Sequence, residues 1–456
     1  MATFDAIVIG TGQSGPPLAV RLAGAGWKVA VIERKLFGGT CINTGCIPTK
    51  TMVASARAAH MARRGAEFGV VLDSPVHVDM KRVKARKDAI VRQSHDGVEK
   101  QLKSTQNITV FEAQARFEGP QIIRAGDPGS EPLQAEKIFL DVGGRASIPP
   151  IPGLDDVDYL TNSSMMDVDF LPEHLIVIGG SYIGLEFGQM FRRFGSEVTI
   201  VERGESLIGH EDEDVSRAVR EILEGEGIRI VTSVANIQVT KNNGGARIEW
   251  DGGEASGSHV LVAVGRVPNT GDLGLDTAGI KRDPRGYIQV DDQLRTTAPG
   301  VWAMGDCNGK GAFTHTSYND YEIVAANLLD GDARRLTDRI PAYNLYIDPP
   351  LGRAGLTERD LRQAGRKALM ATRAMTRVGR AVEKGETQGF LKVLVDPHTR
   401  RILGASLLGV ECDEVIHSIL DVMYAGAPYT VMQRAVHIHP TVSELLPTLL
   451  GDLKPF

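Results

Sequence analysis

Two stretches of the chain share one pattern of apolar and polar positions. Residues 5–34 and 174–203 align without a gap at an offset of 169. Each begins with a short β-branched run, passes through a glycine turn and a helix-length stretch, and ends with a second apolar run followed by Glu-Arg. This order predicts a strand–helix–strand unit in each stretch. Its recurrence at a fixed offset predicts two structurally equivalent units.

The first unit carries glycines at the spacing of a dinucleotide-binding turn. Gly10, Gly12 and Gly15 follow the first apolar run, and Glu33 ends the second. Glycines at these places permit a tight turn, a close approach of the backbone to a pyrophosphate, and close helix–strand packing. The helix N-terminus then offers free N–H groups to the phosphates, and the acid accepts from ribose hydroxyls. The alternative is that these glycines only form tight turns of an α/β sheet.

The second unit repeats this arrangement with one departure. Gly179, Gly184 and Glu202 match the first unit, but Ser181 stands where the central glycine would be. Serine is small enough for the turn, although it makes the backbone approach less close. We expect NADH to be preferred over NADPH, because Glu202 would repel a 2′-phosphate. Arg203 favours NADPH, but less strongly.

Composition and charge exclude several classes of protein. The chain of 456 residues is 42% apolar and 24% charged, as in ordinary globular proteins. Its net charge of −6 provides no basic field for nucleic acid or an anionic membrane. Charges interrupt every long apolar stretch before the ~20 residues that a spanning helix needs, and the first residues show no signal-peptide pattern. We therefore expect a cytoplasmic protein that binds neither nucleic acid nor membranes.

Two of the four cysteines lie close together after the first unit. Cys41 and Cys46 occur in the segment GGTCINTGCIPTK, residues 38–50, where Pro48 is typical of the first turn of a helix. A helix N-terminus lowers the pKa of a thiol and makes it reactive. Zinc would require two further ligands that the segment lacks, so we expect no metal site. A redox-active cysteine pair is the interpretation that fits beside a dinucleotide unit.

Two other polar segments have competing interpretations. The acidic run at 210–214 is expected to be the solvated first turn of a helix rather than a metal site. His437 and His439 are compatible with a metal pair on a strand, with two loop histidines, or with acid–base chemistry.

The cysteine segment resembles the active-site signature of the FAD-dependent pyridine-nucleotide–disulfide oxidoreductases. This family includes dihydrolipoamide dehydrogenase, glutathione reductase and mercuric ion reductase. The resemblance continues over essentially the whole chain, and its motifs occur in the family's order. They are Gly143, PPIPG at 149–153, the second glycine turn, VGRVPN at 264–269, WAMGD at 302–306 and HPTVSE at 439–444.

The resemblance implies an α/β fold with two Rossmann-like dinucleotide-binding domains, one for FAD and one for NAD, and a C-terminal α+β dimerisation domain. The FAD-binding domain would comprise residues 1–150 and 271–340. The NAD(P)H-binding domain would comprise 151–270, and the dimerisation domain 341–456. The cofactors implied are FAD and NADH, or NADPH in its place.

The resemblance also implies the cofactor contacts. The FAD contacts would be Gly10, Gly12, Gly15, Glu33, Gly39, Thr40, Lys50, Gly143 and Asp306. The NAD contacts would be Gly179, Ser181, Tyr182, Gly184, Glu202, Arg203 and Gly265. Tyr182 matches the aromatic residue that covers the nicotinamide pocket.

The catalytic residues implied are Cys41, Cys46, Lys50, Glu186, His439 and Glu444. Cys46 would face the flavin as the charge-transfer thiol, and Cys41 would attack the substrate. Lys50 would lie near the flavin and pair with Glu186. His439 and Glu444 would be an acid–base pair that reaches the thiols of the other subunit of a homodimer. Imidazole suits this task because it exchanges protons near neutral pH.

Several features resemble the reactive-chlorine-resistance and mercuric-reductase-like branch of the family. The segments FTHTS at 313–317, DPPLGR at 348–353 and NDYEIV at 319–324 carry this resemblance. It implies electron transfer from NAD(P)H through FAD to the Cys41–Cys46 disulfide and on to a small-molecule disulfide or a thiol-reactive metal ion. The alternatives are a dihydrolipoamide dehydrogenase, a mercuric ion reductase and a non-catalytic flavoprotein.

Overall fold

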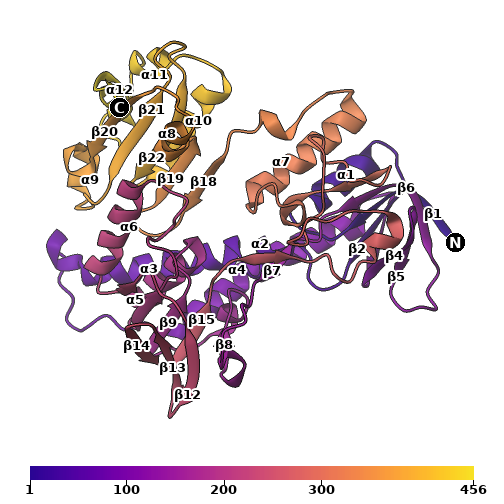
Figure 1. Cartoon of the computed structure of the whole chain (residues 1–456), viewed down its shortest axis with the longest axis horizontal. Helices are drawn as coiled ribbons and strands as arrows, with labels where there is room; N and C mark the ends of the chain where they lie inside the picture. Colours follow the sequence, from indigo (N-terminus) through magenta and orange to yellow (C-terminus); the bar gives the residue numbers. More distant parts are fainter.

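The first repeat unit forms the centre of a seven-stranded sheet. All residues, 1–456, are described by this computed structural model. The sheet has the order β3-β2-β1-β6-β5-β4, with β17 also paired to β6, and β1, β2, β3, β6 and β17 are parallel. Its strands are β1 (Ala2–Ile9), β2 (Val29–Glu33), β3 (Ile108–Glu112), β4 (Ala115–Gly119), β5 (Ile122–Ala125), β6 (Leu133–Leu140) and β17 (Val301–Ala303). Because β17 joins this sheet, a late segment of the chain completes the region around the first repeat unit. Figure 1 shows the helix that follows it, α7 (Thr314–Ala325), beside α1 (Gly15–Gly24).

Both faces of this sheet are covered, because β1 is apolar on both sides. Ala6 and Val8 pack in the cluster that contains helices α1 (Gly15–Gly24) and α7 (Thr314–Ala325), whereas Ile7 and Ile9 pack in the cluster on the opposite face. Three further helices lead from the first unit toward the second. They are α2 (Gly39–Asn43), α3 (Cys46–Arg63) and α4 (Met80–Ser104).

The second repeat unit forms a five-stranded parallel sheet. Its order is β11-β10-β9-β15-β8. The strands are β8 (Tyr159–Leu160), β9 (His174–Ile178), β10 (Glu197–Val201), β11 (Arg229–Val231) and β15 (His259–Val262), and the helices are α5 (Tyr182–Phe194) and α6 (Glu213–Gly225). An antiparallel three-stranded sheet adjoins it, formed by β12 (Gln238–Asn242), β13 (Gly245–Trp250) and β14 (Gly253–Gly257).

A two-stranded ladder joins the regions built around the two repeat units. Strand β7 (Gly144–Ala146) pairs antiparallel with β16 (Arg266–Pro268). The chain leaves the first region through β7 and returns through β16, so the second region is inserted into the first.

The C-terminal part is a six-stranded antiparallel sheet with helices. Its order is β18-β19-β22-β21-β20-β23. The strands are β18 (Ala342–Leu345), β19 (Leu351–Gly355), β20 (Leu369–Ala374), β21 (Phe390–Val395), β22 (Ile402–Leu408) and β23 (Lys454–Pro455). The helices are α8 (Glu358–Gln363), α9 (Gly379–Glu383), α10 (Cys412–Tyr424), α11 (Thr430–Gln433) and α12 (Leu446–Gly451). The predicted architecture of two Rossmann-like units and a C-terminal α+β region is confirmed.

Short 3₁₀ turns connect the regular elements. They occupy Gly65–Phe68, Leu154–Asp156, Ser164–Asp167, Leu275–Ala278, Gly305–Asn308, Leu336–Asp338, Met375–Arg377 and Ser443–Leu445, and α7 continues as a π-helical turn over Ala326–Asp330.

Both repeat units place a glycine against the end of a neighbouring strand. Gly10 and Gly179 have φ of +97° and +117°, which disfavours any residue with a Cβ. A Cβ on Gly10 would lie 2.2 Å from the carbonyl oxygen of Asp141, and one on Gly179 would lie 2.4 Å from that of Ala263. Asp141 follows β6 and Ala263 follows β15. The two turns therefore share one geometry, as the repeat predicts.

The departure at Ser181 has a steric explanation. A Cβ on Gly12, the equivalent residue, would lie 2.8 Å from both carboxylate oxygens of Asp141. The second unit has Ala263 at this strand end, which carries no carboxylate. Serine is thus tolerated where the first unit requires glycine.

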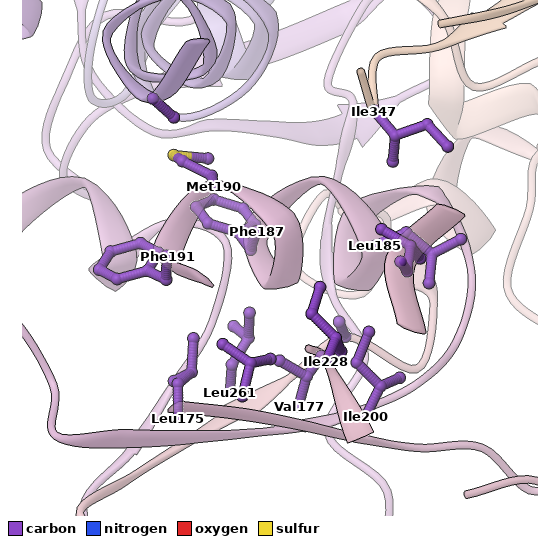
Figure 2. Close-up of a cluster of buried hydrophobic side chains, with 14 of the residues drawn as sticks. Leu175, Val177, Leu185, Phe187, Met190, Phe191, Ile200, Ile228, Leu261 and Ile347 are labelled. Carbon is purple, nitrogen blue, oxygen red and sulfur yellow. The ribbon is translucent and has the colours of Figure 1, made fainter. Parts of the chain in front are cut away.

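Helix α5 is packed on two sides, and this fixes the relative position of the two units. Figure 2 shows Leu175, Val177, Ile200 and Leu261 of the parallel sheet on one side of α5. On another side, the buried cluster continues to Met52 and Ala56 of α3. Because α3 starts at Cys46, the packing of α3 on α5 fixes the cysteine segment beside the second unit.

Two acids of the run at 210–214 are buried, so the expectation of a solvated helical turn was wrong for Glu211 and Asp212, whereas Glu213 is exposed. Glu211 and Asp212 are each 5% exposed. Lys392 of β21 is 1% exposed, and its Nζ lies 2.8 Å from Asp212 Oδ2 and 2.7 Å from Asp214 Oδ1. The sequence pattern could not reveal this, because the cation comes from a distant part of the chain.

We expect Lys392→Met to lower the free energy of unfolding by about 3–5 kcal/mol, because it leaves buried carboxylates without their cation. Chemical denaturation followed by circular dichroism measures this change. Lys384→Met is the matched control, since Lys384 pairs with Glu411 in a more exposed setting, and we expect a loss of about 0–1 kcal/mol. Equal losses for the two variants would contradict the assignment.

Candidate active site

One continuous cavity connects the first glycine turn, the cysteine segment and the start of α5. Its volume is about 540 Å³, within the range of ~300–1,000 Å³ that is usual for ligand and cofactor sites. Glu33 lines one part of the cavity, and Cys46 and Tyr182 line another. The sequence-predicted FAD contacts that line it are Gly10, Gly12, Glu33, Gly39, Thr40, Lys50, Gly143 and Asp306, whereas Gly15 lies behind the turn.

The backbone of the first turn fits a diphosphate. The N–H groups of Gly12 and Gln13 have no acceptor within the chain, and α1 begins at Gly15. Unpaired N–H groups before a helix N-terminus are suited to bind phosphate oxygens. Gly39 must also lack a side chain, because a Cβ there would lie 2.9 Å from Gly12 Cα.

The acids at the strand ends hold these turns in place. Glu33 Oε2 accepts from the Thr11 N–H at 3.0 Å and from the Thr11 hydroxyl at 2.6 Å. In the second unit, Glu202 accepts from the Gly180 and Gly204 N–H groups, each at 2.6 Å. Arg203 is exposed and forms no ion pair. Both acids are thus anchored where a ribose would bind.

Asp306 lines the cavity beside the ladder that joins the two units. Burial raises the pKa of Asp306, and Arg266, whose Nη2 lies 3.4 Å from Asp306 Oδ2, opposes that rise. Gly143 and Gly265 flank this ladder and have φ of +62° and +128°. Arg266 was not predicted as a site residue, although it lies within the VGRVPN motif.

The two cysteines lie on adjacent short elements at the cavity. Cys41 is in α2, and Cys46 is the first residue of α3. Both are unbonded thiols in the structure. Cys46 Sγ lies 3.3 Å from Thr314 Oγ1 at the start of α7. Sequence reasoning missed Thr314, because α7 is remote from the cysteines along the chain.

The surroundings of the two thiols push their pKa values apart. A hydrogen bond from the Cys41 thiol, together with Thr314 and the charge of Lys50, lowers the pKa of Cys46 to about 6 against the opposing effect of burial. The same interaction with Cys46, and then burial, raises the pKa of Cys41. At neutral pH the reduced pair therefore holds a thiolate at Cys46 and a thiol at Cys41.

Lys50 and Glu186 connect the cysteine helix to α5. Lys50 Nζ lies 2.6 Å from Glu186 Oε2, and the Glu186 side chain is 4% exposed. Glu186 Oε1 accepts from the Tyr346 N–H at 3.0 Å, and Lys50 Nζ lies 4.8 Å from the centre of the Tyr346 ring. The pairing that the family resemblance implied is therefore present in the structure.

An aromatic group borders the cavity beside the cysteines. Tyr182, the first residue of α5, lies against Phe313 with ring centres 5.8 Å apart. Phe313 stacks in turn on His315 and Tyr343, with ring centres 5.4 Å apart in each pair. Phe313 was not predicted, although it immediately precedes Thr314. Tyr182 is thus held at the side of the cavity that adjoins the second unit.

His439 and Glu444 form a pair outside this cavity. His439 Nδ1 lies 3.0 Å from both carboxylate oxygens of Glu444. The bond requires hydrogen on Nδ1, so Nε2 of the neutral ring is free to accept a proton. The His439 side chain is 78% exposed, and neither residue lines the cavity of its own chain.

The geometry defines a paired-thiol centre at a cavity that begins at a phosphate-binding type of turn, and comparisons with known proteins identify the class of protein. The family described as pyridine nucleotide-disulphide oxidoreductase matches residues 4–320, and its dimerisation domain matches residues 341–450. The chain belongs to this family of enzymes, which use FAD and NAD(P)H. The predictions of family, enzyme class and cofactors are confirmed.

Individual relatives extend over nearly the full chain. The probable pyridine nucleotide-disulfide oxidoreductase RclA of Escherichia coli is 37% identical, over 100% of both chains. The dihydrolipoyl dehydrogenase of Thermus scotoductus is 33% identical over 97% of this chain and 96% of its own. A solved structure, the Cu(II) complex of the HOCl-induced flavoprotein disulfide reductase RclA from Escherichia coli, has a TM-score of 0.91 and 36% identity, and 99% of each chain is covered.

In this chain, no helix is both long and apolar enough to cross a bilayer.

We expect Thr314→Val to raise the pKa of Cys46 by about one unit, because a hydrogen bond to an ionised group is lost. The rate of Cys46 alkylation by iodoacetamide in the reduced enzyme, followed by mass spectrometry across pH, measures this. The wild-type midpoint is expected near pH 6, with faster reaction above it. Thr44→Val, a cavity-lining control, should keep the midpoint. An unchanged midpoint in Thr314→Val would show that the hydroxyl does not stabilise the thiolate.

Proposed function

We propose that this enzyme passes electrons from NAD(P)H through FAD to a Cys41–Cys46 disulfide, and from the resulting thiols to a disulfide or thiol-reactive metal ion. In this proposal, residues 1–150 and 271–340 bind FAD, 151–270 bind NAD(P)H and 341–456 form the homodimer. The observation that carries it is the pair of thiols with divergent pKa values at the cavity.

Bound FAD supplies the two-electron link between a nicotinamide and a sulfur couple. The residues of the chain then carry out thiol–disulfide exchange. Deprotonated Cys41 attacks one sulfur of the acceptor, forming a mixed disulfide and releasing the first product thiol. The Cys46 thiolate attacks Cys41 Sγ, which re-forms the Cys41–Cys46 disulfide and releases the second product as a thiolate, which takes a proton from water.

This exchange requires a base and an acid near Cys41. Because its raised pKa keeps Cys41 protonated at neutral pH, a base must remove the thiol proton before Cys41 can attack. His439 suits this role, since Nε2 is free while Glu444 holds Nδ1. The imidazolium then returns the proton to the departing thiolate. Glu444 stabilises the charged ring in between.

The acid–base pair reaches the thiols of a second subunit in this proposal. His439 does not line its own cavity, and two apolar neighbours on the same loop, Val436 and Ile438, are 100% and 81% exposed. Exposed apolar residues beside a functional group are typical of an interface. A two-fold symmetric dimer would bring each His439 to the other chain's cysteines.

The acceptor class rests on the thiols and on the Escherichia coli relative. That relative is a disulfide reductase solved as a Cu(II) complex. Paired thiolates also suit soft metal ions such as Hg(II) and Cu(I). If Cu(II) is the acceptor, one dithiol reduces two Cu(II) ions to Cu(I), and the disulfide and two protons are formed. For the electron donor we propose NADH over NADPH, because Glu202, which is held by the Gly180 and Gly204 N–H groups, would repel a 2′-phosphate at the ribose.

One panel of assays tests this function. Turnover with NADH and with NADPH is measured against lipoamide, oxidised glutathione, Hg(II), Cu(II) and a quinone. We expect reduction of a disulfide or a metal ion, and we expect Cys41→Ser to abolish it while NADH-dependent dye reduction persists. Retained disulfide turnover in Cys41→Ser would contradict its role. Rapid NAD⁺-linked oxidation of dihydrolipoamide would instead identify a dihydrolipoamide dehydrogenase.

We expect His439→Ala to slow disulfide reduction about 10²-fold or more, the usual scale for general acid–base catalysis. Stopped-flow reoxidation of the reduced enzyme by the disulfide measures the step directly. His437→Ala is the matched control, because His437 is on the same loop and contacts only the Ala435 carbonyl oxygen. Equal rates in both variants would exclude His439 as the proton carrier.

A further inference from the structure

A buried carboxyl group lies beneath the first glycine turn. Asp141 follows β6, and 4% of the residue is exposed. Its Oδ2 accepts from the Gly15 N–H at 2.7 Å and from the Ser14 N–H at 3.2 Å. These are N–H groups at the N-terminus of α1, where a helix favours a negative charge. Asp141 therefore lies behind the turn whose front offers the N–H groups of Gly12 and Gln13.

Among the acidic residues near the first glycine turn, Asp141 is the one without a cationic partner. Two other acids lie near it on neighbouring elements, the partly buried Asp306 in the 3₁₀ turn that follows β17 and the buried Asp320 in α7. Asp306 lies 3.4 Å from Arg266, and Asp320 pairs with Arg339. Asp141 forms no ion pair, and the turn beside it contributes only uncharged side chains. Burial therefore raises the pKa of Asp141 to about 8, against the two N–H bonds that stabilise its charged form.

Cys307 is the remaining titratable neighbour of Asp141, and its thiol stays neutral. Burial raises the pKa of the Cys307 thiol, whose Sγ contacts the Met304 carbonyl oxygen. Burial also raises the pKa values of Asp306 and Asp320, and the arginine beside each opposes the rise. Asp141 is thus the acid beneath the turn that has no cationic partner, and with a pKa of about 8 it gains a negative charge as the pH passes from 7 to 9.

That charge would lie close to the diphosphate of FAD. A Cβ on Gly12 would be 2.8 Å from both oxygens of Asp141, so a single glycine separates the carboxyl group from the front of the turn. A low-dielectric surrounding strengthens repulsion between like charges. We propose that Asp141 sets an upper pH limit on FAD binding: its neutral form admits the diphosphate, and its carboxylate weakens that binding. The inference rests on the proposed placement of FAD at the first glycine turn.

The direction of the pH effect follows from proton linkage. Repulsion by the diphosphate raises the pKa of Asp141 further in the complex, so FAD binds the protonated form more tightly. Affinity is then constant well below pH 8 and falls above it. For one proton, the dissociation constant of FAD rises about tenfold between pH 7 and pH 9.

Release of FAD from the holoenzyme tests the inference. The holoenzyme is diluted at pH values from 6.5 to 9.5, and the fluorescence of free FAD gives the dissociation constant. We expect the wild-type constant to rise about tenfold from pH 7 to 9, and that of Asp141→Asn to stay flat and be about tenfold lower than wild type at pH 9. Asp5→Asn, which removes an exposed acid from β1, is the control for net charge and should behave as wild type.

The outcomes separate this inference from the placement of FAD. Parallel pH profiles for wild type and Asp141→Asn, or a flat wild-type profile, would overturn the role of Asp141 while leaving FAD binding intact. A chain that holds no FAD at any pH would overturn both. If Asp141→Asn does not fold, Asp141→Ala decides in its place, because alanine is the residue that the second repeat unit carries at this strand end.

Discussion

The contact between α3 and α5 is the constraint on which the site depends. The cysteine segment belongs to the first repeat unit, whereas Tyr182 begins the helix of the second. Their common cavity exists because α3 packs on α5. At the end of this contact that borders the cavity, Lys50 of α3 forms an ion pair with Glu186 of α5. The pair is held on the α5 side by a backbone N–H of Tyr346, so all three regions of the chain meet at one carboxylate. Removing the charge on either partner would leave the other partly buried and uncompensated.

Buried ion pairs also hold the C-terminal region against the second unit. Lys392 meets Asp212 and Asp214, and Arg193 of α5 pairs with Asp348 in the segment before β19. Buried ion pairs contribute little net stability compared with apolar packing, yet breaking one is costly. In this protein, the ion pairs fix the orientation of the C-terminal region. The His439 loop belongs to a region whose angle to the cysteine-bearing core is fixed by specific charges.

The sequence predicted those features that local pattern determines. The repeat of residues 5–34 at 174–203 predicted both strand–helix–strand units, and Pro48 indicated the helix that starts at Cys46. Thr314 and Phe313, at the start of α7, and Asp141, after β6, were missed because both places are remote from the cysteine segment along the chain. No local signal relates Thr314 to Cys46. The burial of Glu211 and Asp212 was missed for the same reason, since their partners, Arg353 and Lys392, lie far along the chain.

The two repeat units show how one backbone geometry tolerates different side chains. In each, a glycine lies so close to the backbone carbonyl at a strand end that a Cβ would clash with it, Gly10 against Asp141 and Gly179 against Ala263. The first unit adds a carboxyl group beneath the turn, and this makes glycine obligatory at position 12. The second lacks that group, and serine is accommodated at position 181. A departure from a sequence fingerprint is therefore explained by the residue at the neighbouring strand end, because that residue determines how much space the turn has.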